Sequence, residues 1–209
     1  QVYEDRLHRI PVRHLESSWL FSSFIEVVRT KDASRIAKRV LDFVGAIVGF
    51  TMLAVLMPII APAVWLDSGG PIFFRQRRLG RGGAPFELLK FRTMVQDSEL
   101  DGSPQWTQRQ DPRVTRVGRF LRRTRIDELP NVVNVLRGEM SLVGPRPERP
   151  EFVVQLEREI PFYRSRLLVQ PGLTGWAQVN GRNAISWEKK FELDAWYVEN
   201  HTLLIDLKI

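Results

Sequence analysis

The longest apolar stretch of the chain covers residues 43–66 and reads FVGAIVGFTMLAVLMPIIAPAVWL, with no charged position. At about 1.5 Å of rise per residue, a helix of roughly two dozen residues is long enough to cross the hydrocarbon core of a bilayer. A secretory signal peptide is disfavoured, because a long polar stretch precedes the segment and the apolar run is too long for one. A pair of buried helices in a soluble protein is a second alternative. The pattern favours a membrane helix, which we place at residues 35–66.

Basic residues flank this segment on both sides: Arg35, Lys38 and Arg39 upstream, and Arg75, Arg77, Arg78 and Arg81 downstream. Because flanks rich in Lys and Arg stay on the cytoplasmic side, a simple span would leave one cluster outside. Pro58 and Pro62 offer a resolution, since a proline inside a helix removes a hydrogen bond and bends or breaks the helix. We therefore favour a re-entrant, monotopic helix broken at Pro58 over a full span. Asp42, near its polar end, is a candidate partner for Lys38 or Arg39.

The next segment alternates between apolar and polar positions and predicts a β-hairpin. Its arms lie at about residues 72–77 and 85–91, and the glycine-rich GRGG makes the turn. The two-residue period of a strand puts Lys90 and Arg92 on one face and Phe91 on the other. A polar loop follows at about residues 95–112.

Three further segments have helical periodicity: residues 114–125, 149–168 and 187–201. In the first, a basic stripe recurs at spacings of three and four, formed by Arg116, Arg119, Arg122 and Arg123. Such a stripe is ordinarily a solvated face, but the neighbouring apolar segment favours contact with lipid headgroups or substrate phosphates. Between the second and third helices, QPGLTGWAQVNGR contains three glycines and predicts a loop. That loop would present Gln178, Asn180 and Arg182.

These elements predict the α+β class. The predicted fold is a single small mixed domain with a β-hairpin, interfacial amphipathic helices and one proline-broken re-entrant membrane helix. Residues 1–34 are assigned to a connector, 35–66 to the membrane helix and 67–209 to the main domain. The last residues, LLIDLKI, stop inside an apolar pattern, which indicates an element cut short.

Composition narrows the chemistry. The formal net charge of +7 favours a polyanionic partner such as nucleic acid, anionic lipid headgroups or a phosphorylated substrate. The chain has no cysteine, which excludes disulfides, Cys-ligated zinc and a cysteine nucleophile. Its three histidines, His8, His14 and His201, form no spaced pair, so a metal site built from histidines is not expected. Any metal would be a hard ion held by carboxylates and phosphates.

The segment DELPNVVNVLRG, residues 127–138, carries helix start and stop signals. Asp127 suits the N-cap, Pro130 suits the first turn, and Gly138 suits the position after the last turn. In this interpretation Asp127 only caps a helix, and Glu128 complements the helix dipole.

The same segment also suits phosphate chemistry. The N-terminus of a helix binds anions, and nearby positive groups keep Asp127 ionised. Two adjacent carboxylates can divide the work: Asp127 attacks phosphorus, and Glu128, together with Asp127, holds Mg²⁺ on the phosphate oxygens. Further along, GPRP places Arg146 in a backbone stiffened by two prolines, and a planar guanidinium binds phosphate oxygens in pairs. On these residues alone both interpretations stay open.

Three motifs follow the proline-containing apolar segment in order: KFRTM, DELPNVVNVLRGEMSLVGPRPE and PGLTGWAQVNGR. Together they resemble the bacterial sugar transferase family, the monotopic polyprenyl-phosphate hexose-1-phosphate transferases or phosphoglycosyl transferases, over residues 35–209. The resemblance implies an enzyme that moves sugar-1-phosphate from a UDP-sugar to undecaprenyl phosphate and releases UMP through a covalent aspartyl-phosphosugar intermediate. It also implies Mg²⁺ as the cofactor and a role in initiating exopolysaccharide, capsule or O-antigen assembly. The implied location is the bacterial inner (cytoplasmic) membrane, with residues 67–209 as a catalytic domain on its cytoplasmic face.

The resemblance carries over to single residues. Asp127 matches the nucleophile, and Glu128 matches its dyad partner and metal ligand. The candidate phosphate-binding residues are Lys90, Arg122 and Arg146, which match family positions, and Arg92, which shares the strand face of Lys90. The candidate residues of the nucleotide-sugar pocket are Gln178, Asn180 and Arg182.

The chain departs from the family pattern at Arg125, where an extra positive charge precedes Asp127 by two residues. Residues 1–34 resemble the connector to an N-terminal regulatory domain in the long family members. We therefore expect the chain to be the catalytic part of a longer protein, with its C-terminal end missing.

Two other functions compete with this one. A non-catalytic basic protein would bind nucleic acid or anionic membrane through its charge, but that function needs neither the adjacent acids nor the Pro-Arg-Pro. A transferase of phospholipid headgroups would need several spans and a cluster of aspartates. The expected partners are therefore a UDP-sugar, undecaprenyl phosphate and membrane lipid, and not nucleic acid. The sequence identifies neither the sugar nor the oligomeric state, for which a homodimer is one alternative.

Overall fold

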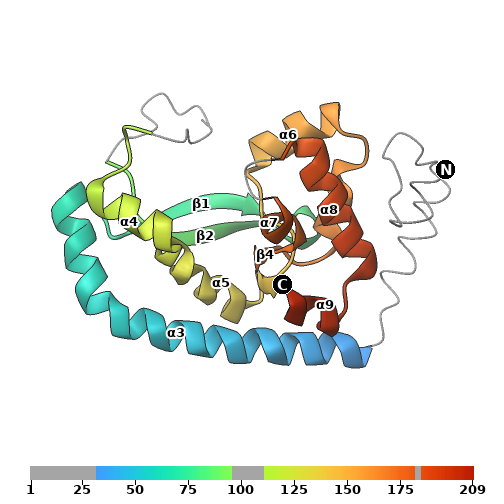
Figure 1. The fold of residues 1–209 in the computed structure, drawn as a ribbon, viewed down its shortest axis with the longest axis horizontal. Helices are drawn as coiled ribbons and strands as arrows, with labels where there is room; N and C mark the ends of the chain where they lie inside the picture. The colour runs from blue at the N-terminus through green and yellow to red at the C-terminus, as the bar shows by residue number, and fades with distance from the viewer. Residues whose placement is uncertain (1–31, 96–110, 182–184) are drawn as a thin grey trace.

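The computed structural model describes residues 32–95, 111–181 and 185–209 (Figure 1). In these ranges the α+β class is confirmed, because helices pack around two small two-stranded sheets. The predicted connector and the predicted polar loop lie almost wholly outside the described residues. The elements in chain order are α3 (Asp32–Ser68), β1 (Phe73–Leu79), η2 (Arg81–Gly83), β2 (Pro85–Phe91), α4 (Arg116–Thr124), η3 (Ile126–Asn131), α5 (Val132–Arg137), β3 (Ser141–Val143), α6 (Pro150–Glu159), η4 (Tyr163–Leu168), β4 (Gly172–Thr174), α7 (Trp176–Asn180), α8 (Trp187–Asn200) and α9 (Leu203–Lys208).

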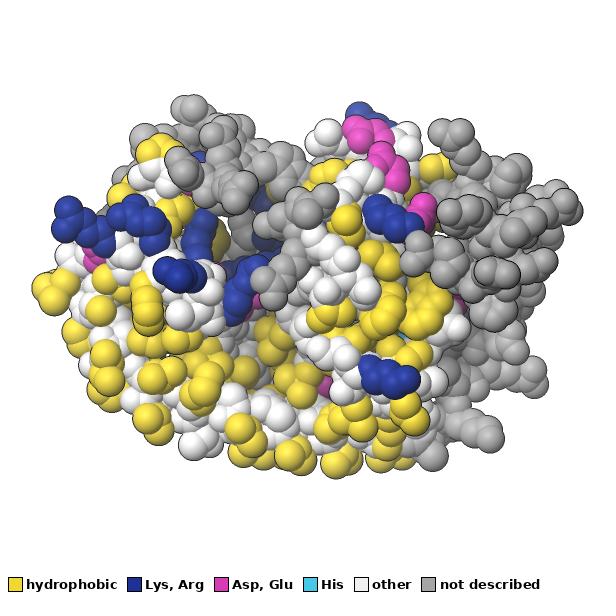
Figure 2. Space-filling view, viewed as in Figure 1, with side chains coloured by type: hydrophobic (Ala, Val, Ile, Leu, Met, Phe, Trp, Pro, Cys, Tyr) yellow, Lys and Arg dark blue, Asp and Glu magenta, His cyan; other side chains and the backbone are white. Residues whose placement is uncertain are grey.

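Helix α3 runs along one whole side of the molecule, the lower edge in Figure 1. One face of its 37 residues is buried against the rest of the domain, through Asp42, Ala46, Leu53, Ile60 and Val64. The opposite face is apolar and exposed, and Figure 2 shows these hydrophobic side chains along the same edge. Residues 34–68 are long and apolar enough to cross a membrane, with a mean hydropathy of 2.4 and only 17% of the most apolar window buried. Because most of this window faces outward, α3 is compatible with membrane association.

The predicted helix break at Pro58 is wrong. Helix α3 continues through Pro58 and Pro62 to Ser68, and its C-terminal part bends, at the left of Figure 1. Each proline removes one intrahelical hydrogen bond, and a bend makes room for the proline ring without ending the helix.

The predicted pairing of Asp42 with Lys38 or Arg39 is also wrong. Asp42 Oδ1 accepts hydrogen bonds from Ser141 Oγ and from the Leu142 N–H, each at 2.9 Å. Lys38 instead pairs with an aspartate of α9, and Arg39 donates to two carbonyls at the C-terminal end of α5. The few polar side chains of α3 therefore attach the helix to the domain.

The predicted hairpin is confirmed. Strands β1 and β2 pair antiparallel, from Phe73 opposite Phe91 to Leu79 opposite Pro85. The turn contains Gly82 and Gly83, whose φ angles of 67° and 80° are readily adopted only by glycine.

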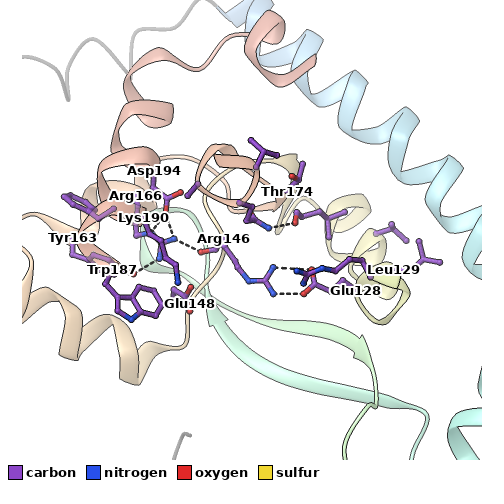
Figure 3. Close-up of a pocket in the computed structure, with 17 residues that line it drawn as sticks. Glu128, Leu129, Arg146, Glu148, Tyr163, Arg166, Thr174, Trp187, Lys190 and Asp194 are labelled. Atoms are coloured by element: carbon purple, nitrogen blue, oxygen red, sulfur yellow. Dashed lines mark hydrogen bonds and ion pairs between the residues drawn. The ribbon is translucent and has the colours of Figure 1, made fainter. Parts of the chain in front are cut away.

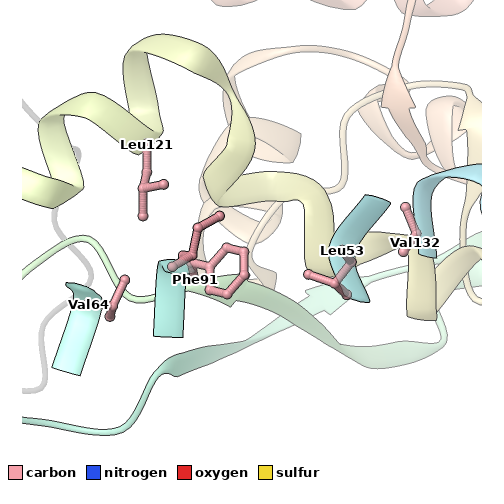
Figure 4. Close-up of a cluster of buried hydrophobic side chains, with 6 residues drawn as sticks. Leu53, Val64, Phe91, Leu121 and Val132 are labelled. Carbon is pink, nitrogen blue, oxygen red and sulfur yellow. The ribbon is translucent and has the colours of Figure 1, made fainter. Parts of the chain in front are cut away.

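A buried cluster joins α3 to the end of this hairpin (Figure 4). Phe91 lies between Leu53 and Val64 of α3 and Leu121 of α4, and Val132 of α5 extends the cluster. Since Phe91 is 1% exposed, its packing fixes the C-terminal end of strand β2. The adjacent Lys90 is therefore directed to the opposite face of the strand.

The predicted helices are confirmed with one exception. Helix α4 lies in the predicted segment 114–125 and is capped by Thr115. Helix α8 lies in the predicted segment 187–201 and is capped by Ser186. The segment 149–168 is not one helix: α6 ends at Glu159, and the short helix η4 begins at Tyr163. Pro161 separates the two, because its ring is incompatible with the preceding helical turn.

The loop predicted for QPGLTGWAQVNGR is wrong in part. Strand β4 pairs in parallel with β3, with Ser141 opposite Gly172 and Val143 opposite Thr174, and the short helix α7 follows. A side chain on Gly172 would collide with the backbone of Gly144, so this glycine serves close strand contact rather than a flexible turn.

Candidate functional site

Asp127 and Glu128 lie in the first turn of η3, between α4 and α5. The prediction that Asp127 is an N-cap is wrong, since Arg125 precedes η3 and no side chain caps it. Asp127 is instead inside a 3-10 helix that runs from Ile126 to Asn131, and so does not have the extended backbone expected of an N-cap. Gly138 does end α5 as predicted, with a φ of 81°. The Asp127 carboxylate is therefore not used in capping: it is buried, and its Oδ1 has no hydrogen-bond partner among the described residues.

Glu128 is held by two cations. Lys90 Nζ donates to Oε1 at 2.9 Å, and Arg146 donates from Nη2 to Oε1 at 2.5 Å and from Nη1 to Oε2 at 3.2 Å (Figure 3). Burial alone would raise the pKa of Glu128, but Arg146 and Lys90 outweigh it and hold the pKa well below its ordinary value. Glu128 is therefore a permanent anion at neutral pH.

The pKa of Asp127 is shifted in the opposite direction to that of Glu128. Burial raises the pKa of its carboxyl, the positive charge of Lys90 opposes that rise, and the negative charge of Glu128 adds to it. Burial also lowers the pKa of Lys90 to about 8, with the positive charge of Arg146 acting in the same direction. One acid of the dyad is thus paired and charged, and its neighbour is buried with an oxygen free to react or bind.

Arg122 approaches the dyad from α4. Its Nε donates to Thr93 Oγ1 at 2.8 Å. Burial lowers the pKa of its guanidinium, and the carboxylate of Asp127 is the largest opposing influence. The structure therefore brings together Lys90, Arg122 and Arg146 around the two acids. Arg92 is different: its Nε is buried without a partner, and no contact among the described residues joins it to either acid.

The backbone that carries Arg146 is fixed at three consecutive carbonyls, residues 145–147. The first accepts from the N–H of Gly172 at 2.9 Å, the second from Arg166 Nη2 at 2.8 Å and the third from Arg78 Nη1 at 3.0 Å. Arg166 is itself held by Asp194, with an Nη2–Oδ2 distance of 2.6 Å, and both side chains are buried. Donors from three separate elements thus fix the direction in which Arg146 leaves the chain.

A cavity of about 460 Å³ opens beside the dyad. Glu128 and Arg146 lie side by side in its lining (Figure 3), and Gln178 of α7 also lines it. Gln178 Nε2 donates to the carbonyl of Leu173 at 2.9 Å, whereas its Oε1 is buried with no partner in the part of the chain that the structure describes. Asn180 donates to the carbonyl of Trp176 instead, and does not line the cavity. Arg182 lies outside the described residues.

The sequence did not predict the α8 wall of this cavity. There Lys190 Nζ lies 4.2 Å from the centre of the Trp187 ring, a cation–π contact, and Asp194 lies one turn further along. The i, i+3 spacing of Trp187 and Lys190 places them on one helix face, but the same spacing is typical of ordinary core and surface residues. Arg166 and Asp194 carried no sequence signal, since they are far apart in the chain and pair only in the fold.

The site fits Mg²⁺ in part. Among the described residues no three acidic or histidine side chains gather at one point. Mg²⁺ often takes only one or two carboxylates and completes its shell with water and substrate phosphates. Asp127 Oδ1 is available as such a ligand, but both oxygens of Glu128 already accept hydrogen bonds from Lys90 and Arg146. A Mg²⁺ ion here would therefore be held mainly through the substrate.

The chain is similar to known proteins over nearly its whole length. The model of the family described as bacterial sugar transferase matches residues 33–209. The chain is 41% identical to a UDP-N-acetylgalactosamine-undecaprenyl-phosphate N-acetylgalactosaminephosphotransferase of Aeromonas hydrophila, over 100% of this chain and 49% of the relative. It is 36% identical to an undecaprenyl-phosphate galactose phosphotransferase of Salmonella typhimurium, over 96% of this chain and 45% of the relative.

A third relative, a UDP-glucose:undecaprenyl-phosphate glucose-1-phosphate transferase of Caulobacter vibrioides, is 46% identical over 82% of this chain and 66% of its own length. The chain spans about half the length of the Aeromonas and Salmonella relatives. The family match covers the long apolar helix, the acidic dyad and the cavity, so the chain belongs to the bacterial sugar transferase family.

Proposed function

We propose that this chain transfers sugar-1-phosphate from a UDP-sugar to undecaprenyl phosphate and releases UMP. The observation that carries the proposal is the state of Asp127, a buried carboxylate with an unpartnered oxygen among three cations. Two carboxylates and four cations, Lys90, Arg122, Arg125 and Arg146, leave the site with a net positive charge of two, which suits a substrate rich in phosphate. In support, the relatives are named as sugar phosphotransferases or sugar-1-phosphate transferases that use undecaprenyl phosphate, with N-acetylgalactosamine, galactose or glucose as the sugar.

Asp127 is the proposed nucleophile. One carboxylate oxygen forms a bond to the sugar-bearing phosphorus of the donor, and the bond from that phosphorus to the bridging oxygen breaks. UMP leaves with the bridging oxygen and its electron pair, and the phosphosugar stays on Asp127 as an acyl phosphate. A phosphate oxygen of the acceptor lipid then attacks the same phosphorus, which frees the carboxylate and produces a lipid diphosphate sugar.

The cations make this attack feasible. A carboxylate and a phosphate repel each other, and the positive charges of Lys90 and Arg122 near Asp127 lower that repulsion. Arg146 offers a planar pair of N–H donors to the phosphate oxygens while Glu128 keeps it aligned. A bound Mg²⁺ would neutralise charge on the phosphate oxygens.

The cavity is the proposed donor site. Its volume of about 460 Å³ is within the range of small-molecule pockets, and it reaches the dyad at Glu128, the residue next to Asp127. Gln178 Oε1, buried and unpartnered, suits an N–H or O–H donor of the nucleotide-sugar.

Helix α3 is the proposed membrane anchor. Its exposed apolar face and its proline bend suit a re-entrant helix that enters one leaflet and returns, with the domain on the cytoplasmic face. The acceptor phosphate would then reach Asp127 at the membrane surface, in the first membrane step of exopolysaccharide, capsule or O-antigen assembly.

UMP release from a panel of UDP-sugars, with undecaprenyl phosphate as acceptor, tests the proposal. We expect turnover with at least one donor, loss of at least about a thousandfold in Asp127→Asn, and loss on chelation of divalent cations. Glu151→Gln, a change at an exposed glutamate of α6, is the matched control and should retain activity. Turnover in Asp127→Asn at the parent rate would refute the assigned nucleophile.

A further inference from the structure

The residue that joins α4 to the dyad has an unusual backbone. Arg125 has a φ of 63° and a ψ of 10°, in the left-handed region that L-residues other than Asn and Asp rarely adopt. Its N–H donates to the carbonyl of Arg122 and ends α4. At the corresponding position after α5 the chain has Gly138, which adopts that conformation freely. Glycine would therefore be the more stable choice at position 125.

Among the described residues, no hydrogen bond or ion pair of the Arg125 side chain offsets this strain. The Arg125 side chain is exposed, and within the described part of the chain no hydrogen bond or ion pair engages its guanidinium. The side chain lines the cavity beside Glu128 and Leu129. It is close enough to Asp127 for its charge to favour the ionised carboxylate. A strained residue with an unpaired cation at a cavity wall is a candidate for ligand binding.

The position of Arg125 identifies the direction from which its ligand comes. Its neighbours on the cavity wall, Leu129 and Val132, pack against α3, the candidate membrane helix. The preceding helix, α4, exposes Phe120 at 61%, and Figure 2 shows Lys and Arg side chains gathered over this helix above the apolar edge of α3. The α8 wall, with Trp187, is formed by a different part of the domain. Arg125 therefore belongs to the side of the cavity nearest α3, the proposed membrane anchor.

We propose that Arg125 binds the phosphate of the incoming acceptor lipid, an inference that rests on the proposed function. A phosphate monoester carries up to two negative charges and must approach a phosphosugar that is itself negative. A guanidinium at the edge of the cavity can pair with two of its oxygens and offset that repulsion while the third oxygen attacks. The phosphorus–oxygen bond to Asp127 then breaks, and the carboxylate leaves with the electron pair.

The test compares Arg125→Gly with the parent protein in vesicles, with separate KM values for donor and acceptor. We expect Arg125→Gly to raise the Tm, because glycine relieves the strain, and to raise the KM for the acceptor phosphate at least about tenfold. The UDP-sugar KM of the first half-reaction, measured as UMP released without acceptor, should change far less. Arg125→Lys should recover part of the acceptor affinity. Arg158→Gln, a change at an exposed arginine of α6 that does not line the cavity, should change the KM for the acceptor less than about threefold.

Three results would contradict the proposal. An unchanged acceptor KM in both Arg125→Gly and Arg125→Asn, which also tolerates the left-handed region, would mean that Arg125 is only solvated. A raised donor KM with an unchanged acceptor KM would assign the residue to the donor diphosphate instead. An equal rise of the acceptor KM in Arg158→Gln would mean that the effect comes from general surface charge. A parent protein inactive with every donor would count against the proposed function itself, not against this role of Arg125.

Discussion

Arg146 and Glu128, 18 residues apart, form a two-pronged ion pair in which both nitrogens of one guanidinium edge meet both oxygens of the carboxylate. Lys90 from β2 completes the set, so three separate segments meet at one glutamate. The pair leaves the neighbouring Asp127 without a partner for its Oδ1. Adjacent acids of the same charge are thereby given different roles, with Glu128 aligning the cations and Asp127 left to react.

Glu128→Gln removes the anion that aligns both cations. We expect kcat/KM to fall at least about a hundredfold, because Arg146 loses its charged partner. We also expect a loss of about 1–3 kcal/mol in the free energy of unfolding at pH 7. The pKa of Glu128 is lowered in the fold, so its stabilisation is present above about pH 4.3 and is lost as the pH falls toward its folded value. Urea unfolding at pH 7 and pH 3 should show that the parent and the variant differ less in free energy of unfolding at pH 3. The same difference at both pH values would contradict the ion pair.

Lys90 should limit activity in alkaline solution. Its pKa of about 8 in the fold lies below the ordinary value for lysine, so the ammonium is lost within an accessible pH range. The kcat/KM for the donor should decline above about pH 8, as the positive charge beside Asp127 disappears. In Lys90→Arg the guanidinium stays charged, and the decline should move upward by at least one pH unit. The same alkaline limb in both proteins would assign it to another group.

The contribution of Lys90 to stability should change with pH in the opposite direction to its contribution to activity. Because burial lowers its pKa, the unfolded chain binds more protons than the folded one between about pH 8 and pH 10.4. The contribution of Lys90 to the free energy of unfolding should therefore increase with pH in this window. Lys90→Met should lack this increase. Thermal unfolding of the parent and the variant at pH 7 and pH 9.5 measures the difference.

Arg166 is expected to act through Arg146 rather than on the substrate. Arg166→Lys keeps a charge near Asp194 but cannot reproduce the fork that also reaches the Arg146 carbonyl. We expect kcat to fall about tenfold or more with little change in the donor KM, while circular dichroism shows a folded protein. A loss confined to KM would place Arg166 in donor binding.

The contact between α3 and the domain can be tested by paired substitutions. A side chain at Gly49 would come within 2.7 Å of Val132 Cγ1, so Gly49→Ala should overpack the contact and destabilise the protein by about 1–3 kcal/mol. Val132→Ala in the same protein should recover part of that loss, because it removes the colliding methyl group. Additive losses in the double variant would mean that the two residues do not touch.

Local patterns predicted local structure well. The alternation in residues 72–91 and the turn glycines were enough for the hairpin, and the periodicity of residues 187–201 was enough for α8. Adjacent acids beside arginines also pointed correctly to a charged cluster. The continuity of α3 was not predictable, since a proline bends one helix and breaks another according to its surroundings.

Contacts between segments far apart in the chain could not be predicted from the sequence. The N-cap prediction for Asp127 failed because residues around Pro130 form tight turns that a helix signal does not reveal. The ion pair of Arg166 with Asp194 joins positions 28 residues apart, and neither has a local signature. The parallel pairing of β3 with β4, which places Arg146 over the cavity, likewise depends on the fold as a whole.

The central claim is that Asp127 carries the phosphosugar between two half-reactions. Intact-protein mass spectrometry after incubation with a UDP-sugar alone, with UMP counted in parallel, tests it most directly. The account predicts up to one UMP per protein without acceptor, a mass increase of one phosphosugar that is absent in Asp127→Asn, and loss of the adduct when undecaprenyl phosphate is added. Full turnover with no UMP release before the acceptor arrives, or an adduct that persists in Asp127→Asn, would contradict it.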